Sequence, residues 1–236
     1  DAEMTALSTA PAGAVAQAGE YLRHGDIDNV EQLLRFLADT FLLEGHGFAP
    51  PREVPDLGVY LPGKGDVPLE RVLEGHDPQR PTIGICFYRS HRLTGNTAFV
   101  DELCRALDEA GANAIPVWSY TLRRGPDGAV PALSLLAGHV DALLVTMLAT
   151  GGSGAVDARS DEDAAWQDWD ASALAALDVP VLQAVCATGS RAAWEESNSG
   201  LAPLDAATQV AIPEFDGRLL AGVISFKERD PLPRYV

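Results

Sequence analysis

Six polar residues between positions 89 and 96 carry side chains that could bind an anion or move a proton. They follow an apolar, β-compatible segment at 82–88 and precede an apolar pattern of helical spacing that runs from Phe99 to Leu107. In open α/β sheets such a junction collects ligands, because backbone N–H groups and the helix dipole favour anions there. The six residues are Arg89, Ser90, His91, Arg92, Thr94 and Asn96.

His91 is the candidate of most chemical interest in this group. It stands between Arg89 and Arg92, and an imidazole can act as a base or a metal ligand near neutral pH. A plain surface histidine is equally compatible with this position.

A second candidate lies near the end of the chain, where Glu214 and Asp216 are separated by one aromatic residue. In an extended segment both carboxylates would point to one side. Such a pair can take up protons or hold a cation, and it would raise one carboxyl pKa. The alternative, which the spacing favours, is an acidic β-turn before a strand.

Two other motifs have simpler interpretations. The glycine-rich stretch at 150–154 lacks the lysine of a phosphate-binding P-loop and the third glycine of a dinucleotide fingerprint, so a flexible turn is favoured over an anion site. The acidic stretch at 157–170 lacks EF-hand spacing, and Trp166 with Trp169 indicates a helix with one packed and one solvated face.

Composition excludes several classes of protein. Against 34 acidic residues stand 17 basic ones, and the net charge of −17 disfavours nucleic acid and anionic membranes as partners. No apolar run reaches the roughly 20 residues of a membrane span, and no secretory signal is recognisable. Cys86, Cys104 and Cys186 are widely spaced, which predicts reduced, buried thiols in a cytoplasmic protein and no structural zinc site.

Three regions separate along the chain. In the first, 1–48, an apolar stripe from Val30 to Phe41 predicts a helix with a capping box of Asn29 and Gln32, and a weaker helix pattern precedes it at 14–23. The second, 49–81, is rich in Pro and Gly and is interpreted as a connector. The third, 82–236, is expected to form an α/β domain, and the chain is expected to be a piece of a longer protein.

The third region alternates short apolar runs with helical patterns. This predicts an α/β fold with a mostly parallel sheet and flanking helices, Rossmann-like or flavodoxin-like, preceded by the helical segment. The expected strands are 82–88, 113–118, 140–147, 180–185 and 219–225.

Several long blocks, in consistent order, resemble the large subunit of the aerobic cobaltochelatase family and, more distantly, that of magnesium chelatase. The blocks are LLRFLADTFL, GVYLPG, FYRSHRLTGNTAFVDELCRALDEAGANAIPVWSYTLR, VPVLQAVCATGSRAAWEESNSGLAPLDAATQVAIPEFDG and ISFKE. The resemblance implies an ATP-dependent ligase that inserts Co²⁺ into hydrogenobyrinic acid a,c-diamide, a tetrapyrrole, in cobalamin synthesis. It also implies that separate AAA+ motor subunits hydrolyse the ATP, which agrees with the absence of a P-loop. Members of this family are several times longer.

The resemblance also suggests roles for individual residues. Glu214 matches the candidate base that removes ring N–H protons, Asp216 would help to deliver or orient the metal, and His91 would contact the ring or the metal. Peripheral carboxylates and amides of the substrate would be held by Arg89, Ser90, Arg92 and Asn96, with Arg191 and Trp194 as weaker candidates for the same wall. The alternatives are a magnesium chelatase fragment that binds protoporphyrin, and a docking domain for the motor subunits without chemistry of its own.

Overall fold

The computed structural model describes residues 9–125, 127–148 and 171–228. The chain divides into two compact units: Asp1–Pro55 with Arg92–Gly95, and Asp56–His91 with Asn96–Val236. Of the segment 49–81 that was interpreted as a connector, residues 49–55 group with the first unit and residues 56–81 with the second.

The first unit is a helical hairpin of α2 (Ala12–His24) and α3 (Ile27–Leu37), continued by the π-helical turn η1 (Ala38–Leu42). The predicted capping box is wrong. Asp26 is the N-cap of α3, and its side chain accepts a hydrogen bond from the backbone N–H of Asn29 at 2.8 Å. The Asn29 side chain instead pairs with the backbone N–H and carbonyl of Arg52, each at 2.8 Å, and so holds the chain that leaves the hairpin.

The buried face of α3 differs from the predicted stripe. Leu33 and Phe36 are buried against Tyr21 of α2, whereas Val30 and Leu34 remain 41% and 63% exposed. A two-helix hairpin has only one helix to cover each face, so only part of a wide apolar stripe can be buried within it.

The second unit is built on one seven-stranded sheet with the order β2-β1-β4-β3-β5-β6-β7. β1 pairs antiparallel with β2 and β4, and all the other neighbours are parallel. The strands are β1 (Leu57–Leu61), β2 (Gly65–Val67), β3 (Thr82–Tyr88), β4 (Asn113–Ser119), β5 (Ala142–Val145), β6 (Val181–Ala187) and β7 (Leu219–Phe226). The predicted fold class and all five predicted strands are confirmed.

Periodicity did not reveal β1 and β2, which lie within 49–81 together with the short helix α4 (Leu69–Leu73). Both strands are short, and the glycines and prolines around them suggested a loop. Trp118 of β4 supports the hairpin by donating its indole N–H to Asp66 of β2 at 2.9 Å.

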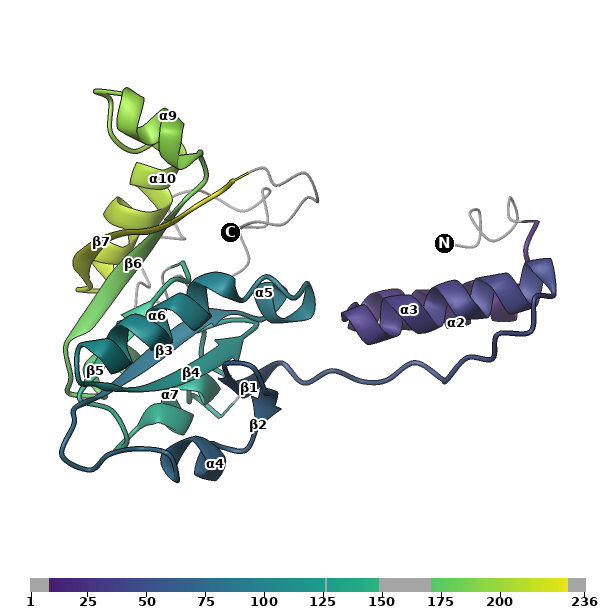
Figure 1. The fold of residues 1–236 in the computed structure, drawn as a ribbon, viewed down its shortest axis with the longest axis horizontal. Helices are drawn as coiled ribbons and strands as arrows, with labels where there is room; N and C mark the ends of the chain where they lie inside the picture. Colours follow the sequence, from purple (N-terminus) through teal and green to yellow (C-terminus); the bar gives the residue numbers. More distant parts are fainter. Residues whose placement is uncertain (1–8, 126, 149–170, 229–236) are drawn as a thin grey trace. The chain divides into compact units, whose positions relative to one another are not determined.

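Helices cover both faces of the sheet. Phe87 of β3 meets Phe99 of α6 (Ala98–Glu109), whereas the preceding residue, Cys86, joins the core cluster that contains Leu133 and Leu136 of α7 (Pro131–Leu136). Successive residues of a strand face opposite sides, so α6 and α7 lie on opposite faces. The remaining short helices, seen in part in Figure 1, are α5 (Arg89–Leu93), α8 (Ser172–Ala175), α9 (Arg191–Glu196), α10 (Pro203–Ala206), η2 (Ala207–Ala211) and α11 (Ile212–Phe215).

Among the described residues, no helix has the length and apolar character needed to cross a membrane. The three cysteines are free thiols, and burial raises the pKa of each to about 12. Cys86 is buried, as predicted, whereas Cys104 and Cys186 are only partly buried.

Candidate functional site

The junction after β3 begins with a single helical turn. Arg89–Leu93 form α5, and the turn closes where the Asn96 backbone N–H donates to the His91 carbonyl at 2.8 Å. The next helix, α6, starts at Ala98. The predicted strand-to-helix junction is therefore confirmed, and His91 lies at the carboxyl end of β3 in the middle of the sheet.

An aromatic row positions the His91 ring. The Tyr60 ring packs edge-on against Phe87, Phe87 against Phe99, and Phe99 against His91, with ring centroids 6.1, 6.3 and 5.0 Å apart. Edge-to-face pairs at these distances are favourable and hold ring orientations. The imidazole is thus held by contacts that run back to β1.

Hydrogen bonds from Tyr60 fix the start of α6 to the same strand. The Tyr60 hydroxyl donates to Asp101 Oδ1 at 2.9 Å and lies 3.1 Å from Thr97 Oγ1. A residue in the segment interpreted as a connector therefore sets the position of the helix that follows the candidate site.

His91 is partly buried and its environment favours the neutral imidazole. Burial lowers its pKa, and the positive charge of Lys227 lowers it further. The Asn96 amide nitrogen lies 3.5 Å from His91 Nδ1. At neutral pH the ring is therefore uncharged and able to accept a proton.

Lys227 was not assigned a role from the sequence, although it lies in the ISFKE block. It follows β7, and its backbone N–H donates to the carbonyl of Gly189, just after β6, at 3.0 Å. Because the charge of Lys227 acts on His91, the segments after β3, β6 and β7 all contribute to one carboxyl edge of the sheet.

The other candidates at the junction differ in their surroundings. The side chain of Arg89 is 13% exposed and forms an ion pair with Asp56 at 3.8 Å. Ser90 is exposed and Asn96 is partly buried. Arg92 groups with the first unit, whereas the other three belong to the second.

The segment around Glu214 and Asp216 is a short helix followed by a turn before β7, in line with the favoured turn interpretation, and it is not the extended segment in which both carboxylates would point to one side. Glu214 lies in the short helix α11 and is exposed, whereas the Asp216 side chain is fully buried and pairs with Arg218 at 2.7 Å. The hydrogen bond from the Gly217 N–H to the Glu214 carbonyl, at 2.9 Å, closes the turn that separates them. Asp216 therefore acts in folding, through Arg218.

Arg218 is the centre of a buried polar cluster that sequence reasoning missed. Its guanidinium donates to the carbonyls of Met147 and Leu148, to the Gln183 side chain and to Asp216, at 2.7–3.2 Å. Burial lowers the Arg218 pKa and the Asp216 charge opposes that effect. The cluster ties the end of β5 to β6 and to the start of β7.

A cavity of about 230 Å³ lies at the carboxyl end of β6. Its walls are the end of β6, the helix α9 and the loop before α10, and they are made mostly of small residues. Trp194 lines it, and the Trp194 ring packs against Phe226 of β7 with centroids 5.4 Å apart. Arg191, at the start of α9, is exposed and pairs with Glu195 at 2.7 Å.

Asp205, another residue without a role predicted from the sequence, also lines this cavity and is only 1% exposed. Its Oδ2 accepts hydrogen bonds from the backbone N–H and the hydroxyl of Thr188, at 2.9 and 3.1 Å. Its Oδ1 is buried and has no hydrogen-bond partner among the described residues. A buried acceptor without a partner costs about 1–3 kcal/mol, so the position calls for an explanation.

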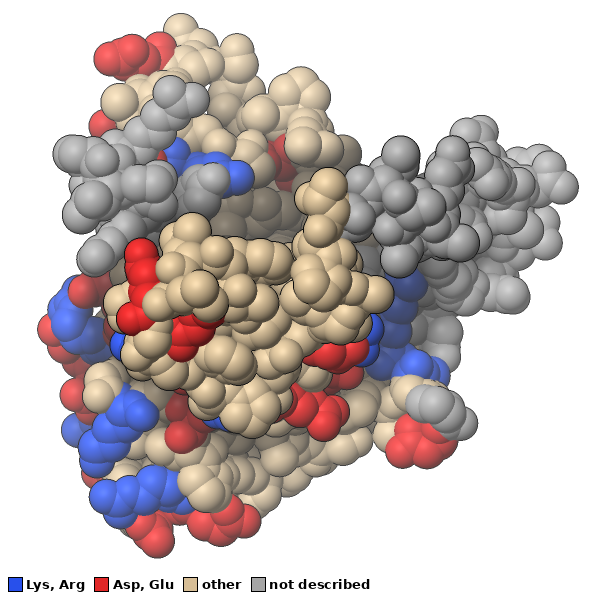
Figure 2. All heavy atoms as spheres, turned by 90° about the vertical axis from the view of Figure 1, so that its right-hand side faces the viewer, with Lys and Arg blue, Asp and Glu red and all other residues tan. Residues whose placement is uncertain are grey.

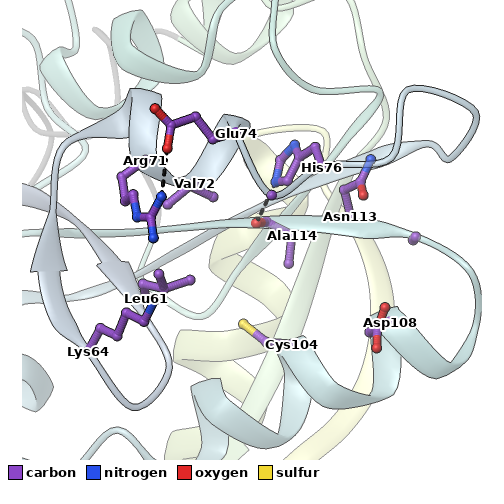
Figure 3. A pocket seen from close by; sticks show the side chains of 12 residues that line it. Leu61, Lys64, Arg71, Val72, Glu74, His76, Cys104, Asp108, Asn113 and Ala114 are labelled. Carbon is purple, nitrogen blue, oxygen red and sulfur yellow. Dashed lines mark hydrogen bonds and ion pairs between the residues drawn. The ribbon is translucent and has the colours of Figure 1, made fainter.

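A second cavity, of about 310 Å³, lies between the β1–β2 hairpin with α4 and the helix α6 (Figure 3). Arg71 and Glu74 form an ion pair at 2.7 Å on its rim, and His76 Nε2 lies 3.3 Å from the Ala114 carbonyl. Ala114 is the second residue of β4, at the amino end of that strand. This cavity is therefore remote along the strands from the carboxyl edge, and none of the predicted site residues lines it.

Within the described residues, no three His, Cys, Asp or Glu side chains come together in a way that could hold a metal ion. Glu214 precedes β7 and His91 follows β3, so these two candidate metal contacts are not adjacent in the chain's own fold. The glycine-rich stretch at 150–154 and the acidic stretch at 157–170 lie outside the described residues.

Charge on the face drawn in Figure 2 is mixed. Acidic side chains occur there in separate groups with basic side chains among them, despite the net charge of −17. That face has no continuous single-sign surface.

Comparisons with known proteins agree with this architecture. A family model described as CobN/Magnesium Chelatase matches residues 19–235. The aerobic cobaltochelatase subunit CobN of Pseudomonas aeruginosa is 30% identical over 227 residues, covering 96% of this chain and 17% of that protein. A magnesium-chelatase subunit of Rhodobacter capsulatus is 31% identical over 208 residues, covering 84% of this chain and 16% of that protein.

Among solved structures, the catalytic subunit of cobaltochelatase from Mycobacterium tuberculosis matches with a TM-score of 0.78 and 42% sequence identity. That match covers 100% of this chain and 19% of the solved one. The chain therefore spans less than a fifth of the length of these relatives.

Proposed function

The chain belongs to the CobN/magnesium chelatase family, and from this membership we propose that it forms part of the tetrapyrrole-binding large subunit of an ATP-dependent cobaltochelatase. The reaction is insertion of Co²⁺ into hydrogenobyrinic acid a,c-diamide in the cytoplasm, with Co²⁺ as a substrate and with ATP hydrolysed by AAA+ partner subunits. The observation that carries the proposal is the partly buried His91 at the carboxyl edge, where segments after β3, β6 and β7 meet and where burial lowers the imidazole pKa.

Metal insertion requires removal of two ring N–H protons and exchange of water on the cation for ring nitrogens. A neutral imidazole can accept a ring proton or contact the incoming metal, and burial together with the positive charge of Lys227 keeps the His91 ring unprotonated. We assign His91 the role of base or ring contact. Glu214 is exposed but precedes β7, at the other end of the strands from His91. We therefore retain it as a separate candidate for proton removal or metal contact, whose partners would come from the rest of the subunit.

Peripheral groups of the substrate would be held at the rim of the same edge. Ser90 and Asn96 offer hydrogen bonds beside His91, and Arg191 offers a guanidinium at the start of α9. Arg92, which groups with the first unit, is retained as a candidate for substrate contact. The Arg89 side chain is mostly buried, unlike that of Arg191, so we assign it mainly to holding α5 in place. Asp216 is not included among the metal contacts because it is committed to Arg218.

Replacement of Glu214 by Gln in the complete subunit, assayed with its motor partners, tests the chemical part of this proposal. Loss of cobalt insertion with retained tetrapyrrole binding supports catalysis. Unchanged insertion rejects that role for Glu214. The matched control is Glu70→Gln, which changes an exposed carboxylate on α4.

Magnesium chelatase is the second candidate, and it is favoured by the 31% identity to the magnesium-chelatase subunit of Rhodobacter capsulatus. Insertion of Mg²⁺ into protoporphyrin IX, without activity on the corrinoid, would select it. A docking domain for the motor subunits without substrate contact is the third. Binding of those subunits by this chain, with no tetrapyrrole binding, would select that function.

A further inference from the structure

The cavity beside α9 carries a chemical feature that the proposed reaction does not use. Its wall includes Asp205, whose Oδ2 is occupied by Thr188 while the buried Oδ1 has no hydrogen-bond partner among the described residues. Apart from this carboxylate the lining is small or apolar, with serine hydroxyls and the Trp194 ring. Such a lining fits a short ligand arm that ends in a hydrogen-bond donor.

The volume of about 230 Å³ limits the size of the group that can enter. At the roughly 30 Å³ that one water occupies in the liquid, this space equals a handful of waters. It can hold a side arm of several heavy atoms but not a macrocycle. A single carboxylate oxygen also falls short of the 6–8 oxygen ligands that a cation such as Ca²⁺ takes.

The cavity opens on the same edge of the sheet as His91. Gly189 lines it, and the Gly189 carbonyl accepts the hydrogen bond from Lys227 whose charge acts on His91. A macrocycle that lies against His91 would therefore have its periphery near the α9 region.

We propose, on the basis of the function proposed above, that this cavity is a subsite for a primary amide arm of the tetrapyrrole and that Asp205 recognises the amide by a hydrogen bond. An amide N–H donates to Asp205 Oδ1 and satisfies it. A carboxylate arm at the same place faces a negatively charged acceptor and is rejected. The subsite thus distinguishes an amidated corrinoid from ring systems whose arms are all carboxylates.

The sharpest variant is Asp205→Asn. Its carboxamide oxygen can keep both hydrogen bonds from Thr188, so its NH₂ group then occupies the place of Oδ1 and turns an acceptor into a donor. The matched control is Asp141→Asn, in which the carboxylate also accepts a backbone N–H, from Thr82 at 2.7 Å, but at the amino end of the sheet. Ala193→Leu, on the cavity wall, fills the cavity and leaves the Asp205 carboxylate unchanged. Circular dichroism and melting temperature confirm that each variant is folded.

The first arm needs no tetrapyrrole. Butyramide and butyrate are titrated into the chain labelled with ¹⁵N at the tryptophan indoles, and the Trp194 signal is assigned with Trp194→Phe. We expect butyramide, but not butyrate, to shift the Trp194 signal, Asp205→Asn to reverse this preference and Ala193→Leu to abolish both shifts. No shift with either ligand in the wild-type chain overturns the subsite, whatever the chain does with tetrapyrroles.

The second arm compares hydrogenobyrinic acid a,c-diamide with the corresponding corrinoid that carries carboxylates in place of the amides. We expect Asp205→Asn to weaken binding of the diamide about tenfold, as expected for a charge-assisted hydrogen bond, and to strengthen binding of the acid form. Equal binding of the diamide by the wild type and the variant overturns the assignment of the cavity to the tetrapyrrole. If butyramide still binds in that case, the ligand of the cavity is instead an Asn or Gln side chain of a protein segment. Butyramide binding without any corrinoid binding would contradict the proposed function and the assignment of the cavity to a tetrapyrrole arm. It would leave intact the conclusion that the cavity binds a primary amide.

Discussion

The junction after β3 and the segment before β7 both attract attention by residue type, yet the structure uses their polar groups in opposite ways. At the junction, His91 is partly exposed and is kept neutral by burial and a positive neighbour. Before β7, Asp216 is fully buried and satisfied by Arg218. The difference teaches that a charged residue that folding has already committed to a buried partner is not available for substrate, however suggestive its spacing.

The largest effect is expected from Arg218→Met, which tests whether the Arg218–Asp216 pair serves folding. If Arg218 and Asp216 are a folding device, the variant leaves a buried carboxylate without its partner and lowers the free energy of unfolding by about 3–5 kcal/mol. Urea denaturation followed by circular dichroism measures the change. Arg191→Met, which removes an exposed guanidinium, is the control and should leave the urea midpoint unchanged. A loss below about 1 kcal/mol in the Arg218 variant would contradict the structural role.

The corresponding test at the junction is His91→Gln in the complete subunit. Removal of a general base is expected to reduce cobalt insertion about 10²–10⁴-fold while the affinity for the tetrapyrrole changes little. His139→Gln, before β5 at the amino end of the sheet, provides the control. Insertion at the wild-type rate would show that His91 is not the base and that, like Asp216, it serves only the fold.

Tyr88→Phe tests how much a β3 residue beside the Arg218 cluster contributes to stability. The Tyr88 hydroxyl accepts a hydrogen bond from the backbone N–H of Leu148 at 2.9 Å, close to the carbonyl that accepts from Arg218. We expect the phenylalanine variant to lose about 1 kcal/mol of stability, the usual net value of one hydrogen bond. Thermal unfolding of the two proteins side by side measures it, and a loss as large as that of Arg218→Met would mean that the two groups form one inseparable cluster.

The smallest effect concerns Lys227. Because its charge lowers the His91 pKa, Lys227→Met should raise that pKa, as measured from the imidazole signals in an NMR titration. Lys64→Met, in the turn between β1 and β2, should leave it unchanged. A lower His91 pKa in the Lys227 variant is the result that cannot be reconciled with the arrangement at the carboxyl edge.

The same shift predicts how stability depends on pH. The unfolded chain binds a proton on His91 near the ordinary imidazole pKa of about 6.5, whereas the folded chain binds it only at lower pH. Stability contributed by the neutral ring is therefore present above that pH and declines as the pH falls through 6.5. The raised thiol pKa values affect stability at alkaline pH. The stability that the neutral buried thiols contribute is lost as the pH rises above the ordinary thiol pKa.

Periodicity in the sequence was sufficient for the parallel part of the sheet, because buried strands such as 82–88 and 181–187 consist mostly of apolar residues. It failed for β1 and β2, where three to five residues between glycines carry too little pattern. It also placed the cap of α3 on Asn29, since Asn29 with Gln32 fits the box as well as Asp26 fits a simple N-cap.

The junction after β3 was predictable because polar residues followed a strand pattern directly. Asp205 and Arg218 were not, because their importance comes from long-range partners, Thr188 and the Met147 carbonyl, which no local spacing indicates. A lone aspartate in the apolar block SGLAPLDAATQ was the only local signal for the first.

The central claim, that the carboxyl edge around His91 holds a tetrapyrrole, is tested most directly by an absorbance titration of hydrogenobyrinic acid a,c-diamide with this chain, with protoporphyrin IX as the parallel ligand. We expect a saturable spectral change with the corrinoid alone, and a weaker one when Asn96 and Ser90 are both replaced by alanine. A folded chain that leaves the corrinoid spectrum unchanged at every concentration would contradict it.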